Sequence, residues 1–283
     1  MARLLKGKEV AEAIVEDLKS RSLSLKEKDI VPTLAILRVG NKDEDISYEK
    51  GIAKRSLEIG IEVKNIILDE NVAKEDFYQT LDKLNKGSSI HGILIFRPMP
   101  SYLDNELARI SINPDKDVDG CSDASLTALF TNSKMGFAPC TAEAVIAILD
   151  HYGIPVQGRN VVVLGRSLVI GKPVSMLLLN RNATITICHT KTNDASDIAS
   201  KADILICATG VMESVDSSYV NQDQTIIDVG ISWNEKKNKL CGDVLFEEVE
   251  SLVKDITPVP GGVGSVTTSI LCRHVIEAAE KQI

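Results

Sequence analysis

The sequence has no excess of positive charge, no apolar run of membrane-spanning length, and no internal repeat or low-complexity segment. The net charge of -8 argues against nucleic acid or an anionic membrane as the main partner, while leaving room for a local basic pocket. The N-terminus, MARLLKGKEVAEAIVEDLKS, is amphipathic and lacks the continuous apolar region of a signal peptide. We therefore expect a cytoplasmic protein with no nucleic-acid or membrane partner.

The cysteines form no CxxC pair and show no metal-ligand spacing. We expect buried free thiols in a reducing cytoplasm and no metal site. The six cysteines are Cys121, Cys140, Cys188, Cys207, Cys241 and Cys272. With 283 residues, of which 44% are hydrophobic and 25% charged, the chain is long enough for two globular domains.

The first half of the chain alternates between helical and strand-like segments. This alternation predicts a mostly parallel sheet with helices on both faces, and functional groups at the carboxyl ends of its strands. Gly40, Phe96 and Arg97 follow strands and should lie there. Helices are predicted at 8–24, 46–60 and 74–86, and strands at 33–40 and 62–69, while residues 91–100 are predicted to be a strand that runs into a proline-containing loop.

A polar, turn-rich stretch, SINPDKDVDG (111–120), is predicted to be a linker between two domains. The second α/β run after it ends in a C-terminal helix beyond Ser265, which is predicted to pack back on the first domain. This run comprises a helix at 141–153, a strand, turn, helix and strand within 160–189, and short strands within 202–210 and 225–232.

The strongest local motif is VVVLGRSLVIGKP, a β-branched run followed by Gly165 and then by Gly171 inside the next helix. A glycine turn lets a pyrophosphate approach the backbone at a helix N-terminus. The spacing is G-x5-G, so the G-x-G-x-x-G fingerprint is only partly met, and a glycine turn of an ordinary βαβ unit is the alternative.

Two features of this region favour a phosphorylated dinucleotide. Arg166 follows the turn glycine, and the second strand ends at CHTKT, where the acidic residue that binds the ribose of NAD is missing. His189, Thr190 and Lys191 take its place, and a cation with a hydroxyl suits a 2′-phosphate. NADP is therefore preferred over NAD. His189 by itself is equally compatible with a core or capping role.

A second feature is the segment SYEKGIAKR (47–55), which is predicted to be helical. At about 100° per residue, Ile52 lies about 40° and Arg55 about 20° from Tyr48 on the helix, whereas Lys50 and Lys54 lie roughly 160° and 120° away. The position one turn after the tyrosine therefore holds an isoleucine.

Several segments together resemble the methylenetetrahydrofolate dehydrogenase/cyclohydrolase (FolD) family, from about residue 3 to the C-terminus. They are PDKDVDG (114–120), GRSLVIGKP (165–173), LLLNRNATITICHTKT (177–192), IIDVGI (226–231), GDVLFEEV (242–249) and TPVPGGVGSVT (257–267). The resemblance implies two α/β domains with a cleft between them, and a homodimer. The expected division is a substrate/catalytic domain of residues 1–118 with helix 266–283, and a Rossmann-type NADP domain of residues 119–265.

The resemblance also implies roles for individual residues. Tyr48 would stack on the aromatic part of the folate and Asp119 would hydrogen-bond the pterin, and both are the expected catalytic residues. Dinucleotide contacts are expected from Gly165, Arg166, Ser167, Thr190 and Ile231. Folate contacts are expected from Tyr48, Phe96, Asp119, Pro260, Gly261 and Gly262.

The sequence departs from the family pattern at the residues that serve hydrolysis. The family has Tyr-x-x-x-Lys, with the lysine as proton shuttle, where this chain has Ile52. The family glutamine that positions this lysine is Phe96 here, and a proline of the GGVGPMT motif is Ser265. Arg55 and Arg97 are new cations near these positions.

We therefore expect NADP-dependent oxidation of methylenetetrahydrofolate to methenyltetrahydrofolate in one-carbon metabolism and purine biosynthesis, with cyclohydrolase activity much reduced or absent. Hydride transfer requires orientation, whereas hydrolysis requires an acid or base. Three alternatives stay open. An arginine substitutes for the lysine and preserves both activities, the site has drifted to another substrate, or the chain is a catalytically silent NADP-binding paralogue.

Overall fold

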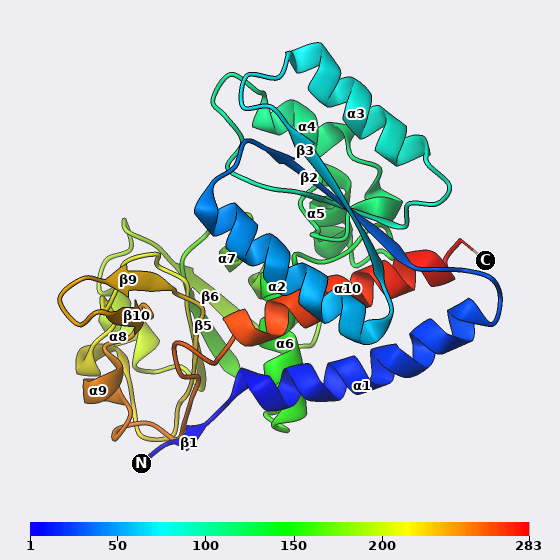
Figure 1. Cartoon of the computed structure of the whole chain (residues 1–283). Helices are drawn as coiled ribbons and strands as arrows, with labels where there is room; N and C mark the ends of the chain where they lie inside the picture. Colours follow the sequence, from blue (N-terminus) through cyan, green and yellow to red (C-terminus); the bar gives the residue numbers. More distant parts are fainter. Residues whose placement is uncertain (283) are drawn as a thin grey trace. The chain divides into compact units, whose positions relative to one another are not determined.

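The structure is a computed structural model in which residues 1–282 are described (Figure 1). The chain forms two compact units: the first joins Met1–Glu12 to Thr141–Thr267, and the second joins Ala13–Cys140 to the residues from Thr268 onward. Each unit has its own parallel sheet, as the alternating pattern predicted. The predicted boundary at residue 118, between a substrate/catalytic domain and an NADP domain, stays a prediction.

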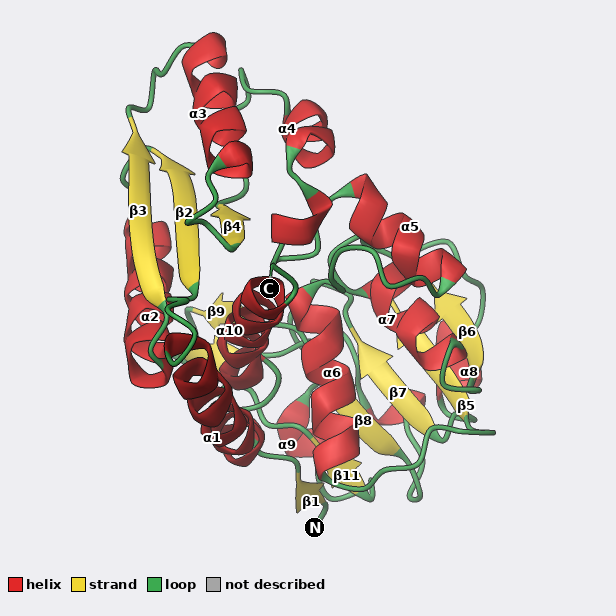
Figure 2. Ribbon diagram, turned by 90° about the vertical axis from the view of Figure 1, so that its right-hand side faces the viewer, coloured by secondary structure: helices red, strands yellow, loops and turns green. Residues whose placement is uncertain are grey.

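The first unit is built on a six-stranded parallel sheet with the order β1-β11-β8-β7-β5-β6. Figure 2 shows β8, β7, β5 and β6 side by side. Its central strands are almost entirely buried, as expected for a parallel sheet that is covered on both faces. The strands are β1 (Arg3–Leu4), β5 (Asn160–Leu164), β6 (Thr184–Cys188), β7 (Ile204–Cys207), β8 (Thr225–Asp228) and β11 (Asp255–Ile256).

Short helices and one antiparallel hairpin complete the first unit. Apolar residues of the sheet, among them Leu164, Leu205 and Ile226, form a continuous core. The remaining elements are α6 (Cys140–His151), α7 (Gly171–Leu179), α8 (Ala195–Ala199), η2 (Ser217–Tyr219), β9 (Ser232–Asn234), β10 (Lys239–Cys241) and α9 (Phe246–Val249).

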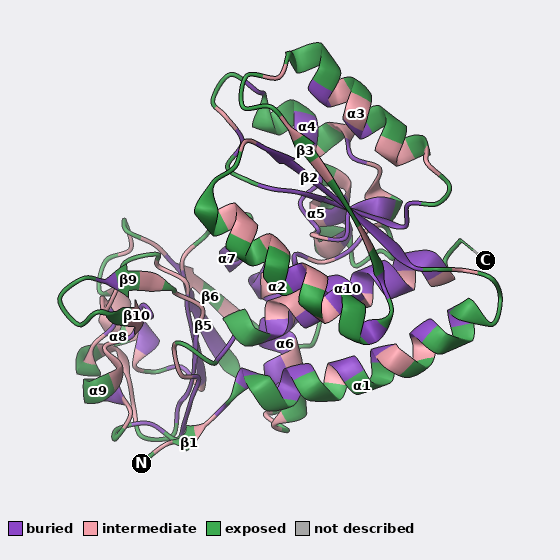
Figure 3. Ribbon diagram, viewed as in Figure 1, coloured by how far each residue is buried: buried purple, intermediate pink, exposed green. Residues whose placement is uncertain are grey.

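The second unit contains a three-stranded parallel sheet with the order β3-β2-β4. The central strand β2 (Thr33–Val39) is buried at all seven positions. The edge strand β3 (Glu62–Leu68) has only exposed and partly buried positions, a difference that Figure 3 shows by colour. The third strand, β4 (Gly92–Ile95), is fully buried. The carboxyl ends of these strands therefore lie at one edge of the sheet.

Helices surround this sheet and are stopped by specific residues. For example, α2 ends at Gly60, whose φ of 95° suits glycine and whose N–H bonds back to Ser56. Arg21 donates to Glu280 at 2.6 Å and so joins α1 to α10. The helices are α1 (Gly7–Lys26), α2 (Asp43–Ile59), α3 (Lys74–Lys86), α4 (Asn105–Ser111), η1 (Pro114–Lys116), α5 (Asp123–Thr131) and α10 (Gly264–Glu280), with the first turns of α1 and α10 in the first unit.

The prediction of a linker at residues 111–120 was wrong. The segment lies wholly within the second unit, and Asp117 and Val118 are fully buried. Asp117 accepts hydrogen bonds from the N–H of Ser122 at 2.7 Å and from Ser125 Oγ at 2.7 Å. Asp117, one of the polar residues that suggested exposure, is therefore buried and hydrogen-bonded to the start of α5.

The other predicted helices and strands are confirmed within a few residues of their ends. The elements that the sequence pattern did not predict include α4, α5, α8, α9, β1, β11 and the β9–β10 hairpin. No helix among residues 1–282 is both long enough and apolar enough to cross a membrane. In the same residues, no three His, Cys, Asp or Glu side chains are grouped so as to hold a metal ion.

Candidate active site

Tyr48 lies on the face of α2 that is directed toward the core of the second unit. At successive four-residue steps along this face, Ile52 and Ser56 are fully buried. Lys50 and Lys54 are exposed on the opposite side of the helix. The helical face that the sequence predicted is therefore confirmed, and the position one turn after Tyr48 presents an apolar side chain to the interior.

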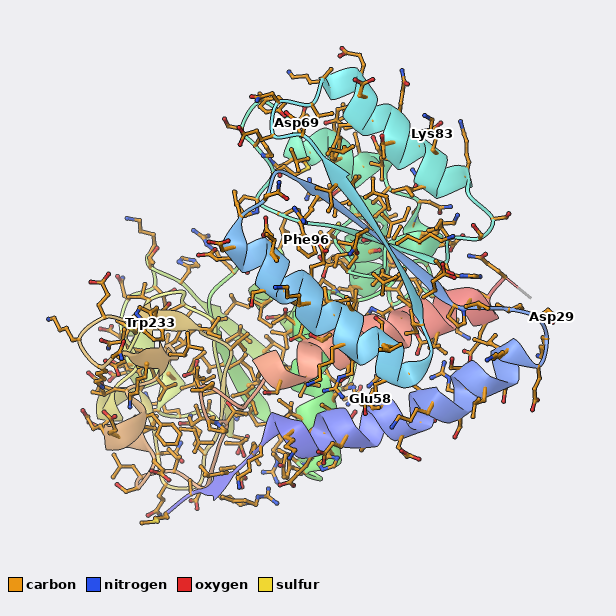
Figure 4. All side chains as sticks on the ribbon, in the orientation of Figure 1. Asp29, Glu58, Asp69, Lys83, Phe96 and Trp233 are labelled. Carbon is orange, nitrogen blue, oxygen red and sulfur yellow. The ribbon has the colours of Figure 1, made fainter. Side chains whose placement is uncertain are left out.

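The ring of Tyr48 contacts Phe96, which directly follows β4. The two ring centroids are 5.6 Å apart and the planes are inclined by 32°. Phe96 is 8% exposed and Tyr48 is 42% exposed, and Figure 4 shows Phe96 beside α2. A tilted pair at this distance is attractive and holds the tyrosine ring in place. An aromatic wall therefore occupies the position that the family resemblance assigns to glutamine.

The charged residues of the motif KDVDG (116–120) have two kinds of role: two are buried and hydrogen-bonded within the fold, and one is partly exposed at the site. Lys116 is 6% exposed and donates to two backbone carbonyls near the end of α3, at 2.7 and 3.3 Å. Asp117 accepts hydrogen bonds from Ser122 and Ser125 at the start of α5, as described above. Asp119 is the only one of the three charged side chains of the motif that is more than a tenth exposed. The motif thus anchors two helices and leaves one carboxylate open to solvent.

Asp119 pairs with Arg97, whose Nη2 lies 3.0 Å from Asp119 Oδ2. Although the Asp119 side chain is 27% exposed, desolvation raises the pKa of this carboxyl to about 6, against the opposing effect of Arg97. Burial, and next the charge of Asp119, raise the pKa of Tyr48. At neutral pH the site therefore combines a neutral phenol with an ionised carboxylate. We call Tyr48, Ile52, Phe96, Arg97 and Asp119 the Tyr48 site.

The two arginines that the sequence singled out are both engaged with carboxylates. Arg97 is held by Asp119, and Arg55 donates to Glu58 one turn further along α2, at 2.9 Å. Glu58 is the last but one residue of α2 and is labelled in Figure 4. Both side chains are guanidinium groups, which remain charged and exchange protons poorly.

The sequence analysis missed one buried group next to this site. His274 on α10 is 1% exposed, and its Nδ1 lies 2.8 Å from the carbonyl oxygen of Val118 and 3.6 Å from Cys140 Sγ. Its ring stacks on Phe137 with centroids 4.9 Å apart. The only signal in the sequence is a histidine within ILCRHVI (270–276), a largely apolar stretch of this helix. It supports the backbone from which Asp119 projects.

In the first unit, the glycine turn after β5 is sterically required. Gly165 has a φ of +122°, and a Cβ there would lie 2.1 Å from the carbonyl oxygen of Ala208. A Cβ on Gly171, the first residue of α7, would lie 2.3 Å from the carbonyl oxygen of Gly165. Both glycines therefore allow close backbone approach, and the N-terminus of α7 begins directly at the turn.

A cavity of about 390 Å³ opens beside this turn, and we call it the Gly165 pocket. It brings together four of the predicted dinucleotide residues, namely Gly165, Arg166, Ser167 and Thr190, whereas Ile231 is 62% exposed and does not line it. The other lining residues are Leu164, Cys188, His189, Ala195, Ala208, Thr209, Val211, Ser214, Val215 and Tyr219.

None of the residues that line the Gly165 pocket is acidic. At the end of β6, His189 Nδ1 accepts the N–H of Lys191 at 3.1 Å, and the N–H of His189 bonds to Thr192 Oγ1 at 2.9 Å. His189 therefore shapes the turn on which Thr190 is exposed. A hydroxyl, a guanidinium and the absence of carboxylates among the lining residues suit a phosphate group.

The predicted folate residues Pro260, Gly261 and Gly262 belong to the first unit, whereas Tyr48, Phe96 and Asp119 belong to the second. Gly261 has a φ of +103°, and its carbonyl oxygen accepts the N–H of Gly7 at 2.8 Å. A Cβ on Gly7 would lie 2.1 Å from the carbonyl oxygen of Gly262. The loop is thus fixed against the start of α1.

A parallel sheet with a glycine turn and a pocket at its carboxyl edge defines a dinucleotide-binding α/β protein. Two family models match the chain: the catalytic domain of tetrahydrofolate dehydrogenase/cyclohydrolase over residues 5–119, and its NAD(P)-binding domain over residues 139–283. The chain belongs to the tetrahydrofolate dehydrogenase/cyclohydrolase family.

Individual relatives cover the full length of the chain. The protein named bifunctional protein FolD from Clostridium botulinum strain Hall is 48% identical over 281 residues, which cover 99% of each chain. The crystal structure of bifunctional FolD from Campylobacter jejuni is 36% identical, covers 100% of both chains and has a TM-score of 0.97. The Trypanosoma brucei enzyme, solved with NADP cofactor and an inhibitor, is 31% identical over 99% of this chain and 98% of its own, with a TM-score of 0.92.

Proposed function

We propose that the protein oxidises methylenetetrahydrofolate to methenyltetrahydrofolate with NADP, and that its cyclohydrolase activity is much reduced or absent. Family membership and the Gly165 pocket support the first part. The second part rests on one observation: Ile52 and Phe96 present an apolar wall to Tyr48 where the family resemblance places a lysine and a glutamine.

The dinucleotide fits the residues of the Gly165 pocket. Gly165 and Ser167 would hold the diphosphate at the start of α7, and Arg166 and Thr190 would face the 2′-phosphate. Ile231 remains our proposal for the nicotinamide ribose. When bound, NADP supplies the nicotinamide carbon that accepts a hydride.

The residues of the Tyr48 site would orient the folate. Asp119, ionised at neutral pH, is proposed to accept from the paired donors of the pterin, while Arg97 holds the carboxylate in place. Tyr48, fixed by Phe96, offers a ring face for stacking. Pro260, Gly261 and Gly262 are proposed to line the folate site with backbone groups. The lone pair of a folate nitrogen assists the departure of the hydride, so orientation and exclusion of water suffice for this step.

Hydrolysis of the methenyl product makes a different demand. Water must lose a proton as it adds to the carbon, and the ring nitrogen must gain one as the C–N bond breaks. A positioned acid or base contributes about 10²–10⁴-fold to such a step. Isoleucine and phenylalanine have no titratable atom. The pKa of the Tyr48 phenol is raised by burial, so the phenol stays protonated at neutral pH and cannot accept a proton from water.

Three alternatives make distinct predictions. Rescue by an arginine requires Arg55 to leave Glu58, or Arg97 to leave Asp119. A site that has drifted to another substrate would use Phe96 and Arg97 as a new apolar and cationic wall. A silent NADP-binding paralogue would bind the dinucleotide without turnover. The retained Tyr48 and Asp119 favour folate chemistry over the last two.

The direct test is NADPH formation by the purified protein with methylenetetrahydrofolate, run in parallel with NAD in place of NADP. We expect turnover with NADP and a clear preference for it over NAD. NADP binding without turnover would support the silent paralogue, and turnover only with another substrate would support drift.

Two further proposals follow from the family. We propose a homodimer that acts in the cytoplasm, in one-carbon metabolism including purine biosynthesis. All six cysteines are free and buried, which is compatible with a reducing compartment. Light scattering coupled to size-exclusion chromatography tests the dimer, because a mass of one chain, 30.7 kDa, would contradict it.

A further inference from the structure

Two buried aspartates lie at the carboxyl edge of the sheet in the first unit. Asp228 ends β8 and is 3% exposed, and Asp243 follows β10 and is fully buried. Leu164, Cys207 and Asp228 are paired in register across β5, β7 and β8. The loops that leave these three strands therefore begin side by side, and the first two of them line the Gly165 pocket.

Asp243 holds the loop that follows β7. Its Oδ2 accepts the N–H groups of Thr209 at 2.6 Å and of Gly210 at 3.1 Å. Thr209 and its neighbour Ala208 line the pocket, and the carbonyl of Ala208 lies against Gly165. The carboxylate therefore fixes the backbone that faces the glycine turn.

Asp228 fixes the backbone of Asp243 by hydrogen bonds. Its Oδ1 accepts the N–H groups of Gly230 at 2.9 Å and of Asp243 at 3.0 Å, and its Oδ2 accepts that of Val244 at 3.0 Å. One carboxylate thus orders the loop after β8 and also the backbone that carries the second carboxylate. The contacts run from Asp228 through Asp243 to Thr209.

Each aspartate also occupies the space next to a glycine. A Cβ on Gly230 would lie 2.2 Å from Asp243 Oδ1, and a Cβ on Gly242 would lie 1.9 Å from Asp228 Oδ2. The stretches DVG (228–230) and GD (242–243) therefore fit together, since the aspartate of each fills the space next to the glycine of the other. This reciprocal fit explains why positions 230 and 242 hold glycine although neither residue has a positive φ.

Keeping two acidic groups buried together is costly. Desolvation raises the pKa of Asp228 to about 7, three backbone hydrogen bonds oppose this rise, and the neighbouring Asp243 adds to it. Cys207 is also buried, and desolvation, followed by the charges of Asp228 and Asp243, raises the pKa of its thiol. The backbone N–H groups that donate to the two carboxylates offset part of this cost.

We propose that Asp228 and Asp243 are positioning residues for the dinucleotide, which together set the wall of the Gly165 pocket opposite the glycine turn. The inference rests on the proposed function, because it assumes that this pocket takes NADP. Neither carboxylate lines the pocket, so both act through the backbone of Thr209 and Gly210.

The hydrogen bonds predict an asymmetry between two isosteric variants. In Asp243→Asn, the amide oxygen can replace Oδ2 and keep both bonds, while the NH2 group takes the place of Oδ1, which has no hydrogen-bond partner among the described residues. In Asp228→Asn, both oxygens accept N–H groups, so the amide nitrogen must face a donor. A donor facing a donor leaves buried groups unpaired.

The test is calorimetric titration of NADP into the wild type and into Asp243→Asn, Asp228→Asn and Asp243→Ala. We expect Asp243→Asn to bind within about 3-fold of the wild type, and the other two at least about 10-fold more weakly. The KM for methylenetetrahydrofolate should stay unchanged in all of them, because the change is confined to the dinucleotide pocket. A general loss of folding would instead lower the active fraction and would not raise the KM for NADP selectively. Asp223→Asn, an exposed change in the same unit, is the control for charge.

The sole tryptophan, Trp233 on β9, is 57% exposed and lies three residues after Gly230, so its fluorescence reports the loop locally (Figure 4). We expect an altered Trp233 emission in Asp228→Asn at temperatures where the protein is folded. Wild-type affinity in Asp228→Asn and in Asp243→Ala would overturn the proposal, as would equal losses in Asp243→Asn and Asp243→Ala. If Asp228→Asn does not fold, the pair of Asp243 variants decides. A wild type that fails to bind NADP would overturn the proposed function instead.

Discussion

The Gly165 pocket and the Tyr48 site depend on different parts of the polypeptide. At the pocket, recognition is prepared by the backbone: Gly165 and Gly171 allow close approach, and loops are fixed by buried hydrogen bonds. At the Tyr48 site, the chemistry depends on side chains projecting from α2 and from the end of β4. We therefore expect side chains such as Ile52 and Phe96 to decide which reaction the Tyr48 site supports, whereas the pocket depends on the backbone.

The largest effect is expected from restoring both family side chains at the Tyr48 site. In the double variant Ile52→Lys with Phe96→Gln, methenyltetrahydrofolate hydrolysis should rise by about 10²-fold or more, because an amine next to the phenol can transfer protons. The measurement is loss of methenyltetrahydrofolate absorbance above the uncatalysed rate.

Ile59→Lys provides a matched control, since it places a buried lysine on the same helix face two turns further along. It should destabilise the protein without any gain in hydrolysis. A double variant that folds, oxidises methylenetetrahydrofolate and shows no gain would contradict our account of the missing pair.

The next effect tests the backbone at the Gly165 pocket. Gly165→Ala should weaken NADP binding by about 100-fold or more, because the φ of +122° and the carbonyl of Ala208 both exclude a Cβ. Gly158→Ala is the matched control: its φ is +72°, but no atom lies within 4 Å of the added carbon. It should cost about 1 kcal/mol of stability and leave NADP affinity unchanged. Equal affinities in the two variants would refute the steric argument.

A third prediction concerns pH at the Tyr48 site. The pKa of Asp119 is about 6, so protons compete with the pterin for this carboxylate at lower pH. Below pH 6 and with NADP kept saturating, kcat/KM for methylenetetrahydrofolate should fall about tenfold per pH unit. The profile of Asp119→Asn should be low and should lack this limb. A wild-type profile flat between pH 5 and 7 would show that the ionised carboxylate is not required.

The smallest effect concerns the choice of dinucleotide. In Thr190→Asp, a carboxylate would repel the 2′-phosphate and accept from a ribose hydroxyl, so the ratio of kcat/KM for NADP to that for NAD should drop by about tenfold. Thr190→Ser, which keeps the hydroxyl, should leave the ratio near the wild-type value. An unchanged ratio in the aspartate variant would place the 2′-phosphate elsewhere.

The contrast between the two regions also explains how much the sequence could predict. Helical periodicity was sufficient to place Ile52 on the buried face with Tyr48, and the glycine spacing was sufficient to locate the pocket. Both patterns are local, and local geometry determines them.

What the sequence could not provide were pairings between distant segments. Residues 111–120 looked like a linker because burial of Asp117 depends on Ser122 and on the rest of the unit. Asp228 packs against Gly242 and Asp243 packs against Gly230, and no regular spacing in the sequence links these two segments. The engagement of Arg97 by Asp119 likewise required the fold, since the two residues lie 22 positions apart.

The most direct test of the central claim compares the two activities of the wild-type protein in a single preparation. Steady-state NADPH formation from methylenetetrahydrofolate is measured beside hydrolysis of methenyltetrahydrofolate at the same pH. Our account predicts ready turnover in the first assay and a rate close to the uncatalysed background in the second. A hydrolysis kcat within about tenfold of the dehydrogenase kcat would contradict it, because the phenol would then work without the amine.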